Sequence, residues 1–306
     1  MVEMMRNKKG LTSGALVKIV VLVVSFSILV WAFSAYLYPM LKGGISDATC
    51  QQTIEMRAGV SGIGAQSAVP IKCQTKKICF VKDKEEGCVE FKGLDYEKVI
   101  IKENYKENLI KEITLLQYDA WKVLGEGRLD YAPSEFWTLK TEKSYCAPYA
   151  RLAFSQELKK EFEKEIIFSY EFIEYQQKNL VPDRKISYFR FLYGADSLSD
   201  VSNQIKNEKG IDVAELKFDI NKQYYIMSIA VKETWFKTIA GGVAGGVVSA
   251  VLLSTGVGIL VVGVAGGGTI GYLTSSGETS FMPPTLIEYD AEVLSGLKCD
   301  DFDFSP

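Results

Sequence analysis

The chain has 306 residues, with 35 basic and 38 acidic side chains, a formal net charge of −3 and no histidine. The missing histidine excludes Ser-His and Cys-His nucleophile systems, histidine acid–base catalysis and histidine metal ligands. The length suits one domain plus membrane segments. The apolar residues are unevenly distributed, because two stretches, 19–41 and 238–277, carry no charge at all.

Residues 19–41 are predicted to form a transmembrane helix. Uncharged runs of this length match the roughly 30 Å hydrocarbon core of a bilayer, since a helix rises about 1.5 Å per residue. The segment 1–18 before it holds four basic residues and one acidic residue. Because positive flanks stay in the cytoplasm, we expect a cytoplasmic N-terminus and an extracytoplasmic chain after residue 41.

The stretch "NKKGL", Asn7 to Leu11, followed by an apolar helix, resembles the class III signal peptide of archaeal type IV pilin-like proteins. The resemblance covers about the first forty residues. It implies a processing site between Gly10 and Leu11, after which the helix stays attached to the protein. Ala15 stands where that family often has a glutamate, and Lys18 interrupts the apolar run. An uncleaved signal anchor is the alternative.

Residues 42–235 are predicted to be an extracytoplasmic α+β domain. They hold 29 basic and 30 acidic residues, which argues against a nucleic-acid partner. An even number of cysteines predicts up to three disulfides in an oxidising compartment. The spacing lacks the close pairs of a structural zinc site. The six disulfide candidates are Cys50, Cys73, Cys79, Cys88, Cys146 and Cys299.

Four elements of this domain have clear local signals. A short helix is predicted from Ser46 or Asp47 to Gly59. Residues 78–91 combine two β-rich runs with a polar turn, which predicts a hairpin that brings Cys79 opposite Cys88. A helix is predicted from Asn104 to about Leu124, because apolar residues recur there at spacings of three and four.

Further elements follow toward the second uncharged stretch. Residues 144–154 are predicted to be a strand, followed by a helix that Ser155 caps. Residues 166–177 fit either a helix or a strand. The aromatic side chains of 188–193 are interpreted as packing under a sheet rather than lining a ligand groove. Residues 222–233 form the best predicted strand of the chain.

The segment 236–275 is predicted to be a glycine-zipper membrane hairpin. One straight helix over the uncharged residues 238–277 would be about 60 Å long, twice what a bilayer requires. A turn at 254–258 divides it into two arms, and small residues recur every fourth position in each arm. A single crossing, or a soluble or conditionally inserting hairpin, is the alternative. The helix-packing candidates are Gly242, Gly246, Ala250, Gly263, Gly267 and Gly271.

The tail, 276–306, carries seven acidic residues against Lys298 alone. A cytoplasmic tail would be expected to carry flanking basic residues, so we expect the tail to return to the extracytoplasmic domain. A strand is predicted over 284–293. If the chain returns, this strand lies beside 222–233 in one sheet, and Cys299 can reach another cysteine of the domain.

No catalytic, cofactor-binding or metal-binding residues are predicted, and no cofactor is expected. Glu161, Glu163 and Glu165 alternate with lysines and indicate a solvated face. "GEGRLD", 125–130, follows a helix and is therefore no phosphate-binding loop. The three tail aspartates lack the spacing and the glycine of a calcium loop.

The sequence thus predicts an α+β domain stapled by disulfides, with an N-terminal transmembrane helix and a C-terminal glycine-zipper hairpin. The Trp121-x-x-x-Gly125-Glu126-Gly127 stretch, with the Cys146 strand and two membrane stretches, is similar to uncharacterised archaeal membrane-anchored surface proteins, which implies no activity. We expect a non-enzymatic cell-surface protein that acts in binding or assembly. Its expected partners are the lipid bilayer and a protein, or a second copy through the glycine-rich helices. A membrane pore and a carboxylate-dependent hydrolase are the alternatives.

Overall fold

A computed structural model of the chain describes residues 13–32, 47–60, 68–132, 144–193, 217–232, 279–291, 294 and 299–302. The chain divides into two compact units, Met1–Ser46 and Asp47–Pro306. Several predictions lie outside the described residues: the processing site at Gly10 and Leu11, the hairpin, and the helix-packing residues Gly242, Gly246, Ala250, Gly263, Gly267 and Gly271.

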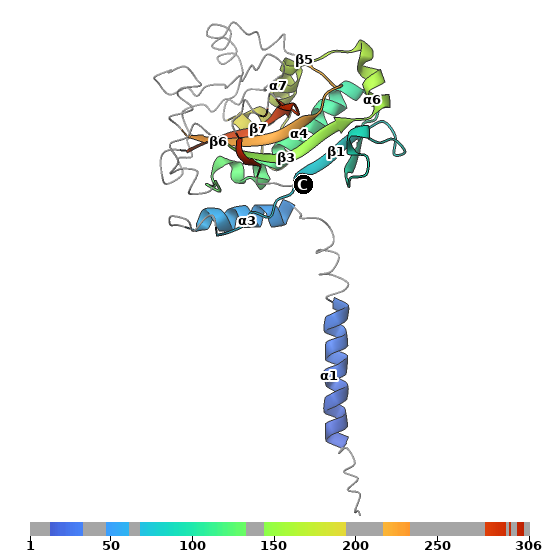
Figure 1. The fold of residues 1–306 in the computed structure, drawn as a ribbon, viewed down its shortest axis with the longest axis vertical. Helices are drawn as coiled ribbons and strands as arrows, with labels where there is room; N and C mark the ends of the chain where they lie inside the picture. Colours follow the sequence, from blue (N-terminus) through green and yellow to red (C-terminus); the bar gives the residue numbers. More distant parts are fainter. Residues whose placement is uncertain are drawn as a thin grey trace, which may run out of the picture. The chain divides into compact units, whose positions relative to one another are not determined.

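In the first unit the structure describes the helix α1, Ser13–Ala32, of 20 residues (Figure 1). It includes residues 19–32 of the predicted span, fourteen residues in all, and Val21, Leu22 and Phe26 are 59%, 70% and 64% exposed. Among the helices of the described ranges, none combines the length and the apolarity that crossing a membrane requires.

The second unit is built on a mixed six-stranded sheet in the order β2-β1-β3-β6-β7, with β8 also pairing with β3. β1 is parallel to both β2 and β3, whereas β3, β6 and β7 are successively antiparallel. The strands are β1 Lys76–Val81, β2 Glu97–Ile100, β3 Ser144–Phe154, β6 Tyr224–Lys232, β7 Thr279–Glu288 and β8 Cys299–Phe302.

The longest strand, β3, is the centre of the sheet. One edge of β3 pairs with β6, while the other edge pairs with β1 over Ala150–Phe154 and with β8 at Ser144 and Cys146. The register with β6 shifts between Pro148 and Ala150, as expected where a proline cannot donate to the ladder. β7 contains Pro283 and Pro284 and lies at the edge of the strand order, which is where a sheet tolerates proline.

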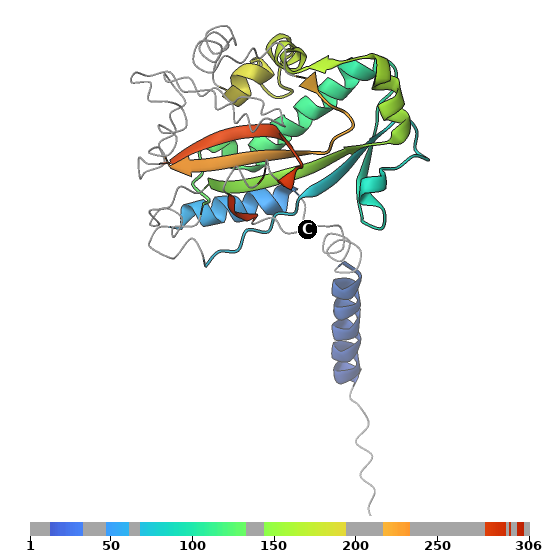
Figure 2. The same ribbon diagram turned by 45° about the horizontal axis from the view of Figure 1, so that its top comes forward.

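The helix α4, Tyr105–Val123, lies across one face of the sheet, and α7 and α8 pack against it (Figure 2). Short turns and a two-stranded sheet also belong to the described part of the unit. The other elements are α3 Asp47–Gly59, α6 Gln156–Glu161, α7 Ser169–Lys178, α8 Tyr188–Tyr193, the 3-10 turns η2 Val89–Phe91, η3 Gly125–Gly127 and η4 Phe162–Lys164, and the paired strands β4 Ile167–Phe168 and β5 Lys217–Phe218.

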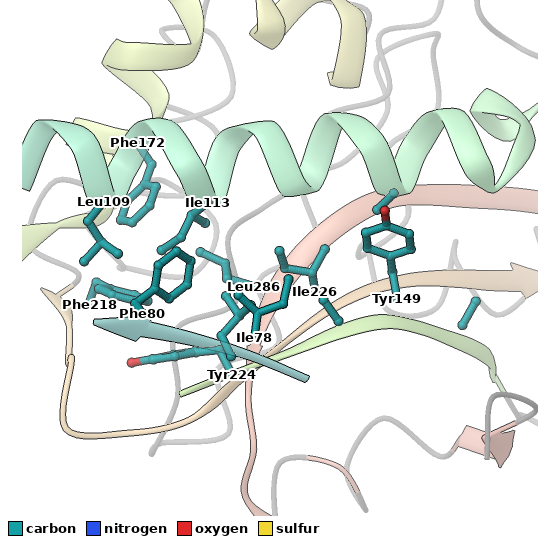
Figure 3. Close-up of a cluster of buried hydrophobic side chains, with 14 of the residues drawn as sticks. Ile78, Phe80, Leu109, Ile113, Tyr149, Phe172, Phe218, Tyr224, Ile226 and Leu286 are labelled. Carbon is teal, nitrogen blue, oxygen red and sulfur yellow. The ribbon is translucent and has the colours of Figure 1, made fainter. Parts of the chain in front are cut away.

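The main hydrophobic core lies between α4 and the sheet (Figure 3). Leu109 and Ile113 of α4 are fully buried there, as are Phe80 of β1 and Ile226 of β6. Their spacing of four residues puts the two α4 side chains on one helix face. Because burying one such side chain contributes about 1.5–3 kcal/mol, this layer fixes the position of α4 on the sheet.

Most of the predicted elements are confirmed. The α+β class, α3, α4, β3 and the cap of α6 agree with the sequence, and the Ser155 hydroxyl accepts from the Leu158 amide at 3.1 Å. The tail strand also pairs with β6, antiparallel, as expected. The ambiguous stretch 166–177 contains two strand residues followed by α7.

The predicted hairpin over 78–91 is wrong. The residues after Cys88 form the turn η2 and not a second strand, and both neighbours of β1 are parallel to it. Phe91 is fully buried against Cys79 and Cys88, whereas Val89 is 67% exposed. The apolar residues of 88–91 therefore fill a small cluster beneath a turn instead of continuing a ladder.

The aromatic stretch 188–193 forms the helix α8, and its rings are buried as expected. They pack on Tyr118 and Trp121 of α4 rather than directly under a sheet. Tyr118 lies edge-on to Tyr188 with ring centroids 5.8 Å apart. These residues are therefore a second core between helices.

Candidate functional site

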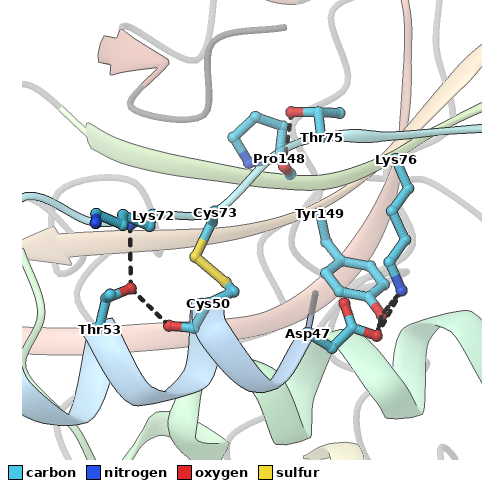
Figure 4. Close-up of a disulfide and its surroundings, with 9 residues drawn as sticks. All are labelled: Asp47, Cys50, Thr53, Lys72, Cys73, Thr75, Lys76, Pro148 and Tyr149. Atoms are coloured by element: carbon cyan, nitrogen blue, oxygen red, sulfur yellow. Dashed lines mark hydrogen bonds and ion pairs between the residues drawn. A yellow bond between two sulfur atoms is a disulfide. The ribbon is translucent and has the colours of Figure 1, made fainter. Parts of the chain in front are cut away.

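The start of α3 is fastened to the sheet by a disulfide and a polar network (Figure 4). Cys50 is bonded to Cys73, just before β1. The Thr53 hydroxyl accepts from the Lys72 amide at 3.0 Å and donates to the Cys50 carbonyl at 2.9 Å. The covalent bond and the hydrogen bond from Lys72 hold the first described helix of the second unit against the chain that enters the sheet.

A buried tyrosine completes this junction. The Lys76 ammonium donates to Asp47 at 2.6 Å and to the Tyr149 hydroxyl at 2.7 Å, and that hydroxyl donates to Asp47 at 3.1 Å. Burial, and then the nearby Asp47 carboxylate, raise the pKa of Tyr149 far above its usual range. The phenol therefore stays protonated and acts as a hydrogen-bond donor, not as a base.

Asp119 of α4 belongs to the same electrostatic environment. Burial raises the pKa of Asp119, Asp47 raises it further, and Lys76 opposes both effects. A lysine, a tyrosine and two carboxylates could support acid–base chemistry in a cleft. Here the lysine and the tyrosine are satisfied by Asp47 and by each other. The arrangement is that of a structural clamp.

The second disulfide joins Cys79 of β1 to Cys88, as predicted. Both cysteines are buried, at 0% and 3% exposure. The pairing prediction was right although the hairpin behind it was wrong, because nine residues of chain can return to the sheet without forming a strand. The bridge holds the loop after β1 over the face of the sheet opposite α4.

The end of β7 is clamped by Arg151 of β3. The guanidinium lies 3.9 Å from the ring centroid of Tyr289 and 5.4 Å from that of Phe91. It also donates to the Gln223 side-chain oxygen at 3.0 and 2.7 Å. Contacts of this kind between a guanidinium and aromatic rings contribute about 0.5–2 kcal/mol each. The chain that follows the segment 233–278 is thereby held on the central strand.

Buried amides hold the same strand from its other face. The Gln117 side chain of α4 donates to the Pro284 carbonyl at 3.1 Å, and Gln176 of α7 donates to Gln117 at 2.9 Å. Both glutamines are 1% exposed. Because a buried carbonyl without a donor costs about 1–3 kcal/mol, this chain of hydrogen bonds specifies where β7 sits under α4.

β6 ends and β7 begins on either side of the segment 233–278, which contains the uncharged stretch 238–277. Lys232, the last residue of β6, is the register partner of Thr279, the first residue of β7. Paired strands lie about 4.7–4.9 Å apart. The segment 233–278 therefore leaves and rejoins the sheet at the same end.

Cys146 of β3 is fully buried and disulfide-bonded. β8 begins at Cys299, whose backbone is the register partner of Ser144, two residues before Cys146. The four cysteines before Cys146 pair among themselves. The structure thus accounts for the first two bridges and brings the backbone of Cys299 next to the strand that contains Cys146.

An open groove of about 670 Å³ lies between the first turn of α4 and α7. Lys106 is paired with Glu171 at 2.7 Å and donates to the Ile166 carbonyl at 3.0 Å. The Tyr175 hydroxyl has a raised pKa because of burial and then of Glu107. The groove holds four carboxylates and two ammonium groups, Glu107, Glu165, Glu171, Glu174, Lys106 and Lys178. This balance disfavours phosphates and other anions.

The predicted solvated face is confirmed where the structure describes it. Glu161 pairs with Lys82, and Glu165 lies 3.9 Å from Lys106. In the described ranges, no group of three or more acidic, cysteine or histidine side chains could hold a metal ion.

A different ionic cluster was not predicted. Glu126, in the turn after α4, has φ 54° and accepts two hydrogen bonds from Arg184, at 3.2 and 2.5 Å. Arg128 lies 3.1 Å from the same carboxylate. The sequence signal was "GEG", because two glycines favour a left-handed turn. The partner Arg184, 58 residues later, had no signal.

No family model, curated protein or solved structure matches this chain.

Proposed function

We propose that the protein is a membrane-anchored cell-surface protein that acts by binding or assembly, with its α+β domain outside the membrane. Two disulfides support this compartment, because such bonds form and persist in oxidising environments. The side chains between the bridges, such as Lys76 and Tyr149, satisfy one another in a structural network. That arrangement supports a scaffold rather than a catalyst.

The anchor in this proposal is the predicted span 19–41, of which α1 is the described part. Exposed apolar side chains along α1 support contact with lipid, because one helix exposing so many large apolar groups to water would be costly. The basic segment 1–18 stays in the cytoplasm.

The observation that carries the proposal is the pairing of Lys232 with Thr279. A single crossing would separate the two ends of the uncharged segment by the roughly 30 Å thickness of the bilayer core. Register partners in adjacent strands cannot be separated in this way. If 238–277 enters the membrane, it must therefore cross an even number of times, and forty residues suffice for two spans.

In the proposed hairpin, the two arms pack through their small residues, and the same faces can join a second copy or a protein partner. Unsatisfied backbone groups are expensive in lipid, so a helix remains the preferred conformation despite the glycines. The acidic tail stays outside with the domain.

Thiol labelling in intact cells tests this topology. Ser305→Cys places a free thiol in the tail, and Ser13→Cys places one on the predicted cytoplasmic side. We expect an impermeant maleimide to label Ser305→Cys in intact cells and Ser13→Cys only after lysis. Protection of Ser305→Cys until lysis would overturn the hairpin, and labelling of both positions in intact cells would overturn the orientation.

A further inference from the structure

The turn after α4 and the segment before α8 together form a basic surface, which we define as residues 122–130 and 183–190 and name the basic collar. It contains five basic residues and three acidic ones, a net charge of +2: Lys122, Arg128, Arg184, Lys185 and Arg190 against Glu126, Asp130 and Asp183. Its cationic side chains reach solvent, since those of Lys122, Arg128 and Arg184 are 41%, 51% and 37% exposed.

The two halves of the collar form one continuous surface because ion pairs join them. Lys122 of the first half lies 3.1 Å from Asp183 of the second, and Arg184 of the second binds Glu126 of the first. Asp183 thus joins the halves through Lys122, and Glu126 joins Arg128 of the first half to Arg184 of the second. Lys185 is exposed and takes part in no ion pair within the described residues.

The collar lies at the end of the sheet where the segment 233–278 leaves and returns. Phe281, two residues after the start of β7, packs against Tyr131, which follows the first half, with ring centroids 5.1 Å apart. Phe281 also packs against the cluster that contains Tyr188 of the second half and its neighbour Phe191. Both halves therefore border the first residues of β7.

The opposite end of the sheet has the opposite charge. α6 follows the last residue of β3, and Leu152 of β3 is the partner of Tyr224, the first residue of β6. Residues 156–178, which include α6 and α7, hold six acidic and four basic residues, a net charge of −2. The domain therefore has a charge difference along the direction of β6.

We propose that the basic collar binds the anionic headgroups of the membrane into which 233–278 inserts. The partner follows from charge complementarity and from position, because basic residues beside a membrane entry point are attracted to anionic lipid. This inference rests on the proposed membrane hairpin. Headgroup binding orients the domain with its acidic end away from the bilayer.

Hydrogen exchange of the full chain in lipid nanodiscs tests the proposal. Discs of phosphatidylcholine alone are compared with discs that contain about one third phosphatidylglycerol. We expect anionic lipid to slow exchange of the amides in 183–190 by about fivefold, the factor that one basic residue near an anionic surface supplies. Exchange in 156–165, at the acidic end, is expected to stay the same.

Two charge-reversal variants make the test specific. Lys185→Glu is expected to abolish the protection, whereas Lys160→Glu, an exposed lysine on α6, is expected to keep it. About 0.5 M salt should also remove the protection, because it shortens the screening length to a few ångströms.

Equal exchange in both kinds of disc would overturn the proposal, and so would protection that survives in Lys185→Glu. Glycerol phosphate added to neutral discs is expected to give no protection, and protection by it would assign the collar to a soluble anion instead. The labelling of Ser305→Cys does not depend on lipid charge. A failure of the collar is therefore distinguishable from a failure of the hairpin.

Discussion

We predict that Cys299 is the disulfide partner of Cys146. Cys146 is bonded, the four preceding cysteines pair among themselves, and β8 starts at Cys299 beside the strand that contains Cys146. Removing this bridge with the double variant Cys146→Ser/Cys299→Ser should lower the free energy of unfolding more than removing the Cys79–Cys88 bridge. Double variants avoid leaving a reactive single thiol.

The magnitude follows from the lengths of the two loops. Cys79 and Cys88 are separated by 9 positions. Cys146 and Cys299 are separated by 299 − 146 = 153 positions. In the chain-entropy model, closing the short loop contributes about 2.7 kcal/mol and closing the long one about 5 kcal/mol. We therefore expect a difference of about 2 kcal/mol between the two double variants, because the long loop restricts the unfolded chain more.

Two measurements test this prediction. Peptide mapping without reduction, after thiol blocking in native membranes, should recover a peptide that joins Cys146 to Cys299. Denaturant unfolding of the full chain in detergent should then rank the variants, with the Cys79→Ser/Cys88→Ser protein as the control. A reduced Cys299 in the map, or equal losses of stability in the two double variants, would contradict the reasoning.

Two further predictions concern single side chains. Gly127→Ala should cost about 2–4 kcal/mol in unfolding free energy, because φ is +68° and the new Cβ would lie 2.8 Å from Trp121. Gly93→Ala shares the positive φ but has nothing within 4 Å, so it should cost about 1 kcal/mol; equal costs would remove the steric part of the explanation. Tyr118→Phe should raise the pKa of Asp183, measured by carboxyl NMR titration, because the hydrogen bond from the Tyr118 hydroxyl, 2.7 Å long, and then that from Lys122 hold this pKa below its usual value. The stabilisation of the fold by ionised Asp183 is present above the unfolded-state pKa and disappears as the pH falls through the folded-state pKa. An unchanged pKa of Asp183 in Tyr118→Phe would show that the Tyr118 hydroxyl does not lower this pKa.

The sequence predicted those elements whose signals are local. α4 has apolar residues at helical spacing, and Gly125 ends it with φ 80°. The Ser155 cap of α6 needs only the next three residues. The pairing of β6 with β7 was predicted without a local signal, from the expectation that the membrane segment returns to the side it left. The placement of the two strands in one sheet is confirmed, whereas the segment between them lies outside the described residues.

The hairpin at 78–91 shows why local pattern fails for parallel strands. β1 and β2 are parallel neighbours joined by residues 82–96, just long enough for a parallel connection, and the disulfide occupies that connection. The sequence pattern of two apolar runs around a polar turn is the same whether the second run pairs with the first or folds back beneath it. The second run can pair with β1 only if an edge of β1 is free. β2 and β3 occupy both edges, and a short window of sequence around β1 does not include these strands.

The candidate sites were harder to predict because they join distant segments. Glu126 and Arg184 are 58 residues apart, and Tyr149 meets Asp47 across 102 residues. Taken alone, each of these residues is typical of an ordinary polar surface. Only the packing of α4 on the sheet brings the turn after α4 close to the segment before α8, and that packing depends on side chains from strands that are far apart in the sequence.

Every segment that leads toward a predicted membrane element is attached to β3. The start of α3 reaches it through the Tyr149 hydroxyl, β6 through a long antiparallel register, and β8 through Ser144 and Cys146. The end of β7 reaches it through the Arg151 guanidinium. If the proposed anchor and hairpin move relative to each other in the bilayer, both therefore pull on the same buried strand, β3. Because buried strands open only with the whole domain, the proposed topology would couple the anchor and the hairpin through the most stable part of the fold.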